Sequence, residues 1–312
     1  MKFSVIVSIY NCADVLPITV PALLTQDYPS DSLEIILVDD ASTDATSSLL
    51  RDPLWQERCV VIRHPENRGR CATRNSGLDR ATGDVLIFMD CDIQVDSTFV
   101  ARHAERHQDP GTVGILSNVQ PGTRPLRDKY HRYLFEGKRG AKQVGHHKPL
   151  PFRYFIMTCS SIKASAVHKT GRFNENLQSY GIDLEYAYRL WKNYPDGLFY
   201  APEIPVLMHR LKALDEALGD FREFGRYNVP VILDDNPTLS SYVGGDFVID
   251  RRTGPSLKTL AGLFIFNPVA ASLARGMFHL LPYPLSNVLV RYLMVNSVVR
   301  GYRESPLRRK NR

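Results

Sequence analysis

Across the first 110 residues, short apolar runs alternate with segments of helical periodicity, and this alternation limits the folds open to the chain. Each run is too short for a helix and apolar at nearly every position, which is typical of strands buried on both faces of a parallel sheet. The alternation predicts a doubly wound, mostly parallel α/β sheet flanked by helices. The strands are expected at residues 3–9, 33–38, 60–63 and 85–89, with helices at 13–26, from a cap at 42 or 43 to about 50, and at 69–81.

The remainder of the chain is less regular. Residues 120–150, rich in basic residues, glycine, proline and histidine, are expected to form a long and partly helical excursion. Residues 255–303 are apolar but interrupted by prolines, and no apolar stretch there reaches the ~18–20 residues of a membrane-spanning helix. Amphipathic helices fit better, either packed on the protein or lying at a membrane interface. Further strands are expected at 114–119, 155–160, 198–200 and 206–208, and further helices at 93–110, 183–191 and 211–228.

The net charge and the cysteine content limit which partners and which cellular compartment fit the sequence. The net charge of +6 favours anionic partners such as nucleotides, phospholipids or nucleic acid, and basic residues gather at 124–153 and at 308–312. The five cysteines form no C-x-x-C pair, which argues against a disulfide framework and structural zinc and favours a reducing cytoplasm. No signal peptide is expected, because the first strand meets polar residues without a small-residue cleavage site.

Two aspartates, Asp90 and Asp92, directly follow the apolar run at residues 85–89. Aspartate is rarely buried without a partner, and ligands of open α/β sheets bind beyond the carboxyl ends of strands. The pair therefore indicates a divalent cation held by oxygen ligands and shared with a substrate phosphate. The alternative is a turn or a helix N-cap, because aspartate is common at both.

Four ordered segments carry a resemblance to a known family: residues 4–11 (SVIVSIYN), 34–44 (EIILVDDASTD), 67–77 (NRGRCATRNSG) and 90–92 (DCD). Together they resemble the opening of the family 2 inverting glycosyltransferases with the GT-A fold. The third segment is similar to the family's N-x-G-x-x-x-A-R-N-x-G pattern, and the fourth stands where the family has its D-x-D. The resemblance covers roughly residues 1–210 and implies a GT-A fold, followed here by a C-terminal helical extension.

The resemblance assigns a nucleotide-sugar site to the ends of the first strands. It implies that Ser8, Tyr10 and Asp40 contact the uridine, while Arg74 and Asp90 contact the remainder of the donor. A carboxylate can accept the N3–H of uracil and a tyrosine ring can stack on the base, so both contacts are physically reasonable. As an alternative, Asp40 is a turn or cap residue.

The resemblance also implies a metal cofactor, Mn²⁺ or Mg²⁺, which would stabilise charge on the departing diphosphate as a Lewis acid. Asp92 is expected to coordinate the ion, together with Asp90. His209 is similar to a metal-binding histidine that some GT-A enzymes place late in the domain, although a structural histidine at a strand end is the alternative. Either Arg70 or Arg74 is expected to contact the diphosphate or to position the two aspartates, because arginine offers a fork of donors for either role.

An inverting transfer needs a base that takes the proton of the acceptor hydroxyl. Residues 181–190 (GIDLEYAYRL) resemble the family's G-E-D-x-E-L-x-x-R-L region, which implies that Asp183 is this base. The sequence departs from the pattern at Ile182, where many members have glutamate. Glu185 is the alternative base, and a helix N-cap is the alternative role of Asp183.

These expectations combine into a metal-dependent inverting glycosyltransferase that moves a sugar, expected from a UDP-sugar, to a hydroxyl acceptor in glycan, polysaccharide or glycolipid synthesis. The acceptor is expected to be lipid-linked or a saccharide. Residues 1–230 would form the catalytic domain, with a nucleotide-binding half at 1–110 and an acceptor half at 111–230. Residues 231–312 would form an amphipathic helical region. The protein is expected in the cytoplasm, peripheral at the anionic cytoplasmic face of a membrane.

Two other functions fit the sequence less well. A nucleotidyltransferase acting on sugar phosphates usually has a glycine-rich phosphate loop after its first strand, whereas residues 10–14 (YNCAD) contain no glycine. A nucleic-acid-binding protein would match the net charge, but the acidic cluster would repel phosphate without a metal. No nucleic-acid partner is therefore expected.

Overall fold

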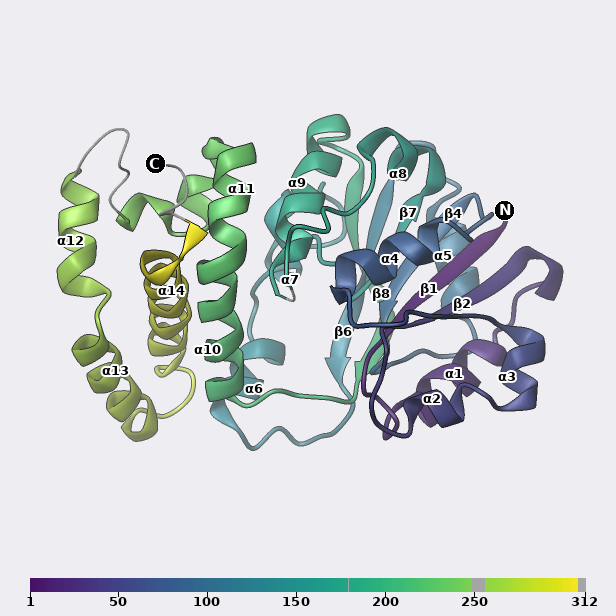
Figure 1. The fold of residues 1–312 in the computed structure, drawn as a ribbon, viewed down its shortest axis with the longest axis horizontal. Helices are drawn as coiled ribbons and strands as arrows, with labels where there is room; N and C mark the ends of the chain where they lie inside the picture. The colour runs from purple at the N-terminus through teal and green to yellow at the C-terminus, as the bar shows by residue number, and fades with distance from the viewer. Residues whose placement is uncertain (179, 249–255, 308–312) are drawn as a thin grey trace. The chain divides into compact units, whose positions relative to one another are not determined.

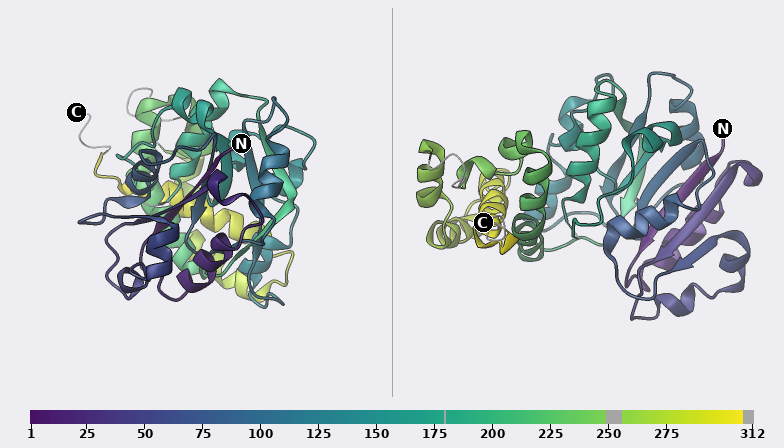
Figure 2. Two further views of the ribbon diagram at one scale, coloured as in Figure 1. Left: turned by 90° about the vertical axis from the view of Figure 1, so that its right-hand side faces the viewer. Right: turned by 45° about the horizontal axis from the view of Figure 1, so that its top comes forward.

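The computed structural model describes residues 1–178, 180–248 and 256–307. The chain forms two compact units, shown as ribbons in Figures 1 and 2. The first unit consists of Met1–Arg124, Lys138–Glu175 and Asp183–Leu211, and the second of Pro125–Gly137, Asn176–Ile182 and Lys212–Arg312. The functional boundary expected near residue 230 stays a prediction, because compactness alone assigns no function.

The first unit is built on one eight-stranded sheet with the order β3-β2-β1-β4-β7-β6-β8-β5. The strands β1, β2, β3 and β4 pair in parallel, as do β6 and β8, while β7 and β5 run against their neighbours. This arrangement confirms the predicted mixed, mostly parallel α/β sheet. The strands are β1 (Phe3–Ile9), β2 (Leu33–Asp39), β3 (Val60–Arg63), β4 (Val85–Asp90), β5 (Ile93–Gln94), β6 (Gly114–Pro121), β7 (Cys159–Lys163) and β8 (Leu198–Met208).

Helices cover both faces of this sheet, which explains why its central strands β1 and β4 are buried at nearly every position. On one face, alternate residues of β1 such as Val5 join a core with α1 (Leu16–Leu24) and α5 (Phe99–Arg106). On the other face, a Cβ added to Gly77 of α4 (Gly69–Leu78) would lie 2.3 Å from Ile6 Cγ2, so this helix packs closely on β1. The other helices of this unit are α2 (Thr46–Leu49), α3 (Pro53–Arg58), α7 (Ala141–Val144), α8 (Ala164–Thr170) and α9 (Ile182–Asn193).

Three sequence expectations were wrong in their boundaries, and long-range pairing explains two of them. The helix expected at 93–110 begins only at Phe99, because residues 93–94 pair with β8 as the short strand β5. The two strands expected at 198–200 and 206–208 are one strand, β8, which runs along β6 with a register shift at Ser117/Asn118. The strand expected at 155–160 lies at 159–163 instead.

The second unit is helical, which confirms the predicted C-terminal helices. Its core joins Tyr130 and Tyr133 of α6 with Leu218 of α10, Phe278 of α13 and Leu293 of α14. Among the described residues no single helix is long and apolar enough to cross a membrane, although α12 and α13 pass that test as a pair bent by 55°. The helices are α6 (Lys129–Phe135), α10 (Leu214–Glu223), a π-helix (Phe224–Asn228), α11 (Val229–Asp235), α12 (Leu257–Ile265), α13 (Pro268–Leu280) and α14 (Asn287–Glu304).

Two glycines allow α14 to approach α10 and the π-helix closely. A Cβ at Gly301 would lie 2.0 Å from the carbonyl oxygen of Arg222, and one at Gly225 would lie 2.1 Å from that of Val298. Backbone atoms cannot move aside as the end of a flexible side chain can. These two glycines therefore set the distance of α14 from α10 and the π-helix.

We therefore expect Gly301→Ala to lower the free energy of unfolding by about 1–3 kcal/mol, because the added methyl group overpacks a helix contact. Gly276→Ala in α13 is the matched control, since a Cβ there meets no atom within 4 Å. The control should be neutral or stabilising by up to about 1 kcal/mol, from helix propensity alone. Urea denaturation followed by circular dichroism measures both variants, and equal stability of the two would contradict this account of the contact.

Candidate functional site

Parallel strand pairing brings several predicted site residues to one edge of the sheet. Ser8 in β1 is the register partner of Asp90 in β4, and Ile9 is the partner of Asp39 in β2. Tyr10 follows directly and leaves 46% of its surface exposed. The carboxyl ends of β1, β2 and β4 therefore present polar groups side by side, where open α/β sheets bind ligands.

Arg74 joins two of the predicted carboxylates. Its side chain, 2% exposed, comes from α4 and places Nη1 at 2.7 Å from Asp183 Oδ1 and Nη2 at 3.7 Å from Asp90 Oδ1. The guanidinium carbon lies 5.3 Å from the ring centroid of Phe173. The structure thus gathers Arg74, Asp90 and Asp183, which are far apart in the sequence, around one buried positive charge.

Asp183 lies in the first turn of α9, which begins one residue earlier at Ile182. Its Oδ1 accepts from Arg74, and its Oδ2 accepts the backbone N–H of Met157 at 3.1 Å. Both oxygens are therefore oriented by donors outside its own helix. Glu185, the alternative base, is 3% exposed and forms a two-pronged ion pair with Arg189, and its role as a base stays a prediction.

Asp92 and His209 lie together across the pairing of β5 with β8. The backbone N–H of His209 donates to the carbonyl oxygen of Asp92 at 2.9 Å, and its Nε2 lies 2.8 Å from Gln94 Oε1. A Cβ at Gly122 would lie 2.9 Å from His209 Nδ1, so the glycine leaves room for the imidazole. The strand pairing itself therefore positions this histidine beside the Asp92 backbone.

The two aspartates after β4 are held in an environment that disfavours their charge. Burial, and secondly the neighbouring Asp90, raise the pKa of Asp92 to about 6. Burial also raises the pKa of Asp90, although Arg70 and Arg74 oppose that shift. A bound cation would relieve both carboxylates, which is the chemistry expected of a metal site.

The fit of a metal to these residues is partial. Within residues 1–178, 180–248 and 256–307, no three or more His, Cys, Asp or Glu side chains form a group that could hold a metal ion. Asp92, Asp90 and His209 are donor types that suit Mn²⁺ or Mg²⁺, but oxygen atoms of a substrate would have to complete the coordination.

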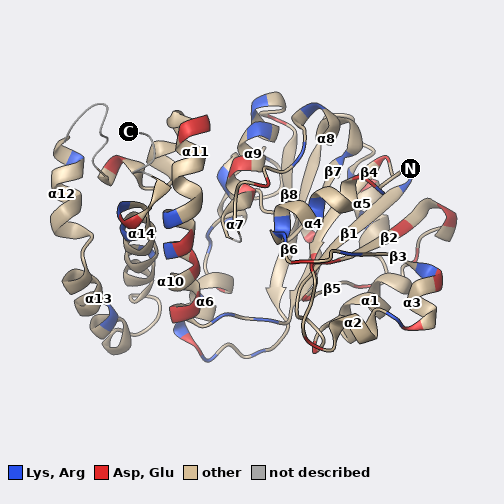
Figure 3. Cartoon of the chain, viewed as in Figure 1, with Lys and Arg blue, Asp and Glu red and all other residues tan. Residues whose placement is uncertain are grey.

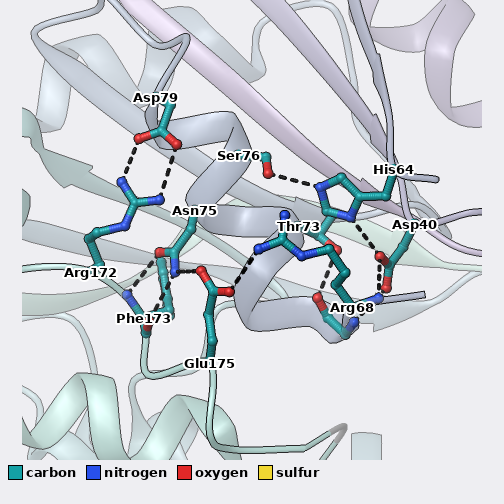
Figure 4. A network of polar contacts seen from close by, with 11 residues as sticks. Asp40, His64, Arg68, Thr73, Asn75, Ser76, Asp79, Arg172, Phe173 and Glu175 are labelled. Atoms are coloured by element: carbon teal, nitrogen blue, oxygen red, sulfur yellow. Dashed lines mark hydrogen bonds and ion pairs between the residues drawn. The ribbon is translucent and has the colours of Figure 1, made fainter. Parts of the chain in front are cut away.

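Asp40 contacts groups of the protein itself, whereas the sequence predicted a contact with the nucleotide. It is 3% exposed and accepts the backbone N–H groups of Arg68 and Gly69 at 2.9 and 2.8 Å. It also lies 2.7 Å from Nδ1 of His64, whose Nε2 contacts Ser76 at 2.8 Å, as Figure 4 shows. Asp40 therefore holds the loop that enters α4, and its contact with a nucleobase stays a prediction.

Sequence reasoning did not select Asp39, the neighbour of Asp40. Asp39 is fully buried at the end of β2, where Oδ1 accepts the N–H of Ser42 at 3.0 Å. Oδ2 lies 3.0 Å from Nη1 of Arg63, but the geometry of that contact is not that of a hydrogen bond. This oxygen is therefore short of donors at the ligand-binding edge of the sheet, and burial is a signal that the sequence does not reveal.

The two arginines expected to contact a diphosphate are in different situations. Arg74 is buried and engaged with Asp183, whereas 51% of the Arg70 side chain is exposed, with Nη1 at 4.0 Å from Asp90 Oδ2. Arg70 therefore has the freer guanidinium, and Arg74 acts mainly on the two carboxylates.

Residues of α4 also anchor the segment that leads toward Asp183. Figure 4 shows Asn75 exchanging two hydrogen bonds, each 3.0 Å, with the backbone of Phe173. Asn75 additionally donates to Glu175 at 2.8 Å, and Arg68 donates to the same carboxylate at 3.1 Å. Arg74 thus contacts Asp183, and its neighbour Asn75 contacts the segment that precedes Asp183 in the sequence.

Comparison with known proteins identifies a family for this chain. The sequence model described as "Glycosyl transferase family 2" matches residues 4–171. The chain is 27% identical over 233 residues to the uncharacterized glycosyltransferase YfnE of Bacillus subtilis (strain 168). That match covers 59% of this chain and 58% of YfnE, so the chain spans little more than half the length of this relative.

Solved structures share the fold at low sequence identity. S. aureus TarS 1–349 in complex with UDP-GlcNAc has a TM-score of 0.58 and 17% identity, covering 100% of this chain and 93% of that one. Mannosyltransferase PcManGT from Pyrobaculum calidifontis, in complex with GDP-Man and Mn²⁺, has a TM-score of 0.61 and 19% identity, covering 97% and 88%. These matches confirm the expected GT-A fold with its C-terminal helices.

The raised pKa of Asp92 predicts a pH-dependent cost to stability. An unfolded aspartate titrates at 3.8 and the folded one at about 6, so the folded state loses stability as the pH rises from about 4 to about 6. Above that window Asp92→Asn should raise the free energy of unfolding by about 1–3 kcal/mol in metal-free buffer, after discounting for partial exposure.

Urea denaturation at pH 4.5 and pH 8 without divalent cations tests this prediction. The gain from Asp92→Asn should shrink at the lower pH, whereas Asp31→Asn, at an exposed position of the same unit, should change little at either pH. A destabilised Asp92→Asn protein at pH 8 would show that Asp92 makes a stabilising contact instead.

Proposed function

The chain belongs to glycosyl transferase family 2, and we propose that it transfers a sugar from a nucleotide-sugar donor to a hydroxyl acceptor with inversion at the anomeric carbon. The observation that carries this proposal is the buried Arg74, which links Asp183 to Asp90 at the ligand-binding edge of the GT-A sheet. A single displacement requires a base beside the acceptor and stabilisation of the leaving diphosphate, and Asp183 and a cation held near Asp90 would supply these.

Asp183 is the proposed base. In the displacement, the acceptor oxygen forms a bond to the anomeric carbon while the bond from that carbon to the diphosphate breaks. The hydroxyl proton passes to Asp183, and the bonding electron pair leaves with the nucleoside diphosphate. A carboxylate has about four lone-pair sites, so the donors Arg74 and Met157 N–H orient Asp183 and still leave sites for this proton.

The proposed binding partners of the leaving diphosphate are Arg70 and a cation held by Asp92, Asp90 and His209. A divalent ion bound there would supply Lewis-acid stabilisation of the departing charge. The half-exposed guanidinium of Arg70 offers donors to phosphate oxygens without giving up a buried ion pair. PcManGT, which was solved with Mn²⁺, supports a metal-dependent reaction in this fold.

The donor is proposed to be a UDP-sugar, bound by Ser8, Tyr10 and the aspartates at the end of β2. The exposed ring of Tyr10 can stack on a base, and the buried Asp39 oxygen lacks a hydrogen-bond donor. TarS with UDP-GlcNAc supports a uridine nucleotide, whereas PcManGT with GDP-Man makes a guanosine nucleotide the alternative.

The acceptor is proposed to be a saccharide or a lipid-linked molecule, reached by a cytoplasmic protein that is peripheral at an anionic membrane face. Basic residues of the segment 124–153, with Lys142 and Lys148 among them, support an anionic surface as a partner. A nucleotidyltransferase is the second enzymatic candidate, and it would release pyrophosphate rather than a nucleoside diphosphate.

We expect Asp183→Asn to lower the transfer rate by about 10²–10⁴-fold, because the amide cannot accept the hydroxyl proton. Nucleotide affinity should change little, since the proposed base contacts the acceptor and not the nucleotide. A nucleotide-release assay over a panel of UDP-sugars and GDP-sugars measures the rate, and calorimetry with UDP or GDP measures the affinity.

Asp79→Asn is the matched control, because Asp79 is an exposed aspartate of the same unit that pairs with Arg172. Its transfer rate should equal that of the unmodified protein. Normal turnover by Asp183→Asn would refute the proposed base. Release of pyrophosphate from a nucleoside triphosphate and a sugar 1-phosphate, supplied in place of the nucleotide sugars, would favour the nucleotidyltransferase.

Removal of metal should stop the reaction. EDTA is expected to abolish nucleotide release, and added Mn²⁺ should restore it. Asp92→Asn should raise the Mn²⁺ concentration for half-maximal release by at least about tenfold, because it replaces the charged ligand. Asp31→Asn serves again as the control, and full activity in EDTA would exclude a metal-dependent mechanism.

A further inference from the structure

Among the described residues, the helices α12 and α13 of the second unit carry half of the large apolar side chains that are exposed. Phe264 is 82% exposed and Leu280 is 83% exposed. We call this surface the outer face. It consists of Leu257, Leu260, Leu263, Phe264, Ile265, Val269, Leu273, Met277 and Leu280.

The helix α13 carries apolar side chains on both its buried and its exposed side, whereas those of α12 are mainly exposed. In α13, Ala274 and Phe278 are buried in the core of the second unit, whereas Val269, Leu273 and Met277 repeat at four-residue spacing and are 50–70% exposed. A surface helix of a water-soluble protein normally presents charged or polar residues on its outward stripe. A helix that is apolar all round is suited to a buried position or to lipid.

Charge identifies which partner the outer face fits. The only Asp, Glu, Lys or Arg residues in α12 and α13 are Lys258 and Arg275, and Figure 3 shows these two helices without any acidic residue. Both cations contact carboxylates of neighbouring segments, Asp246 at 3.3 Å and Asp215 at 2.8 Å. Such exposed ion pairs are weak, so an anionic headgroup can compete for the same cations.

Helix length determines how the outer face can meet a membrane. The 9 residues of α12 and the 13 residues of α13 extend about 14 and 20 Å, well short of the ~30 Å hydrocarbon core. The 55° bend between them, at Phe266 and Asn267, prevents a straight span. Short apolar helices with flanking cations fit the interface of a single leaflet.

We propose that α12 and α13 form an in-plane membrane anchor, which inserts the outer face into one leaflet and places Lys258 and Arg275 at anionic headgroups. This proposal rests on the proposed function in one respect: the anchor is the surface by which the proposed enzyme binds its membrane partner. The segment 308–312, whose basic residues were expected to contribute, lies outside the described residues.

Flotation of the full chain with phosphatidylcholine vesicles, with and without phosphatidylglycerol, tests the anchor. The unmodified protein should float with the vesicles, and more of it should float when the anionic lipid is present. Phe264→Gln and Leu273→Gln should each weaken partition roughly tenfold, and together roughly a hundredfold, because each side chain loses its burial in lipid. Leu54→Gln is the matched control, since Leu54 is 52% exposed in the first unit and should leave partition unchanged.

Insertion depth gives a second readout that does not depend on loss of binding. Phe264→Trp should add fluorescence that brominated lipids quench, most strongly with bromine near the headgroups. The native Trp55 and Trp191, both in the first unit, provide the background in the unmodified protein. Stronger quenching by bromine at the bilayer centre would overturn the in-plane arrangement in favour of a span.

Three further results would overturn the anchor. The unmodified protein could fail to float with either vesicle type, or the glutamine variants could float as well as the unmodified protein. The third result is a dimer that forms without vesicles and that the glutamine substitutions dissociate. The last result would assign the outer face to a second copy of the chain. Calorimetry with UDP and Mn²⁺ separates this test from that of the proposed function. Vesicle binding without nucleotide binding would refute the enzyme and leave the anchor standing, and the reverse would refute only the anchor.

Discussion

The buried guanidinium of Arg74 is the interaction on which the remainder of the site depends. A charge that is 2% exposed must be compensated, and here Asp183 at 2.7 Å and Asp90 at 3.7 Å provide the compensation. Removing one partner of such a buried pair commonly costs several kcal/mol, because it leaves the other charge unpaired. Three elements, α4, β4 and α9, are therefore held in one relative position by a single side chain.

This constraint also explains why so much of α4 is polar yet buried. Asn75, next to Arg74, forms two hydrogen bonds with the backbone of Phe173. At the start of the helix, Asp40 accepts the N–H groups of Arg68 and Gly69. These bonds fix the helix at both ends of the site without using Asp92, whose charged form remains costly. Hydrogen bonds and ion pairs thus hold Arg74, Asn75 and Asp40, whereas the pKa of Asp92 stays raised until a cation or a proton neutralises its carboxylate.

The sequence predicted the parallel half of the sheet well because the signal there is local. Each strand from β1 to β4 is a continuous apolar run, and the aspartates at the ends of β2 and β4 mark the edge where ligands bind. The pairing of β5 with β8 and the loop-holding role of Asp40 were not predictable, since each depends on contacts between residues that are distant in the sequence. Likewise, no local pattern shows that residues 125–137 and 176–182 join the C-terminal helices in one compact unit.

In the sequence, the proposed base is the first residue of a segment that belongs to the first unit. Residues 176–182 belong to the second unit and Asp183 to the first, so the chain passes from one to the other at the peptide bond before the base. Within the second unit, the Asn228 side chain bonds to the backbone of Gln178 and Tyr180. Gly181 has φ +73°, and a Cβ there would lie 2.3 Å from Phe224, so glycine is required where the chain turns toward α9. The chain therefore enters α9 from a segment whose backbone is held within the second unit by Asn228.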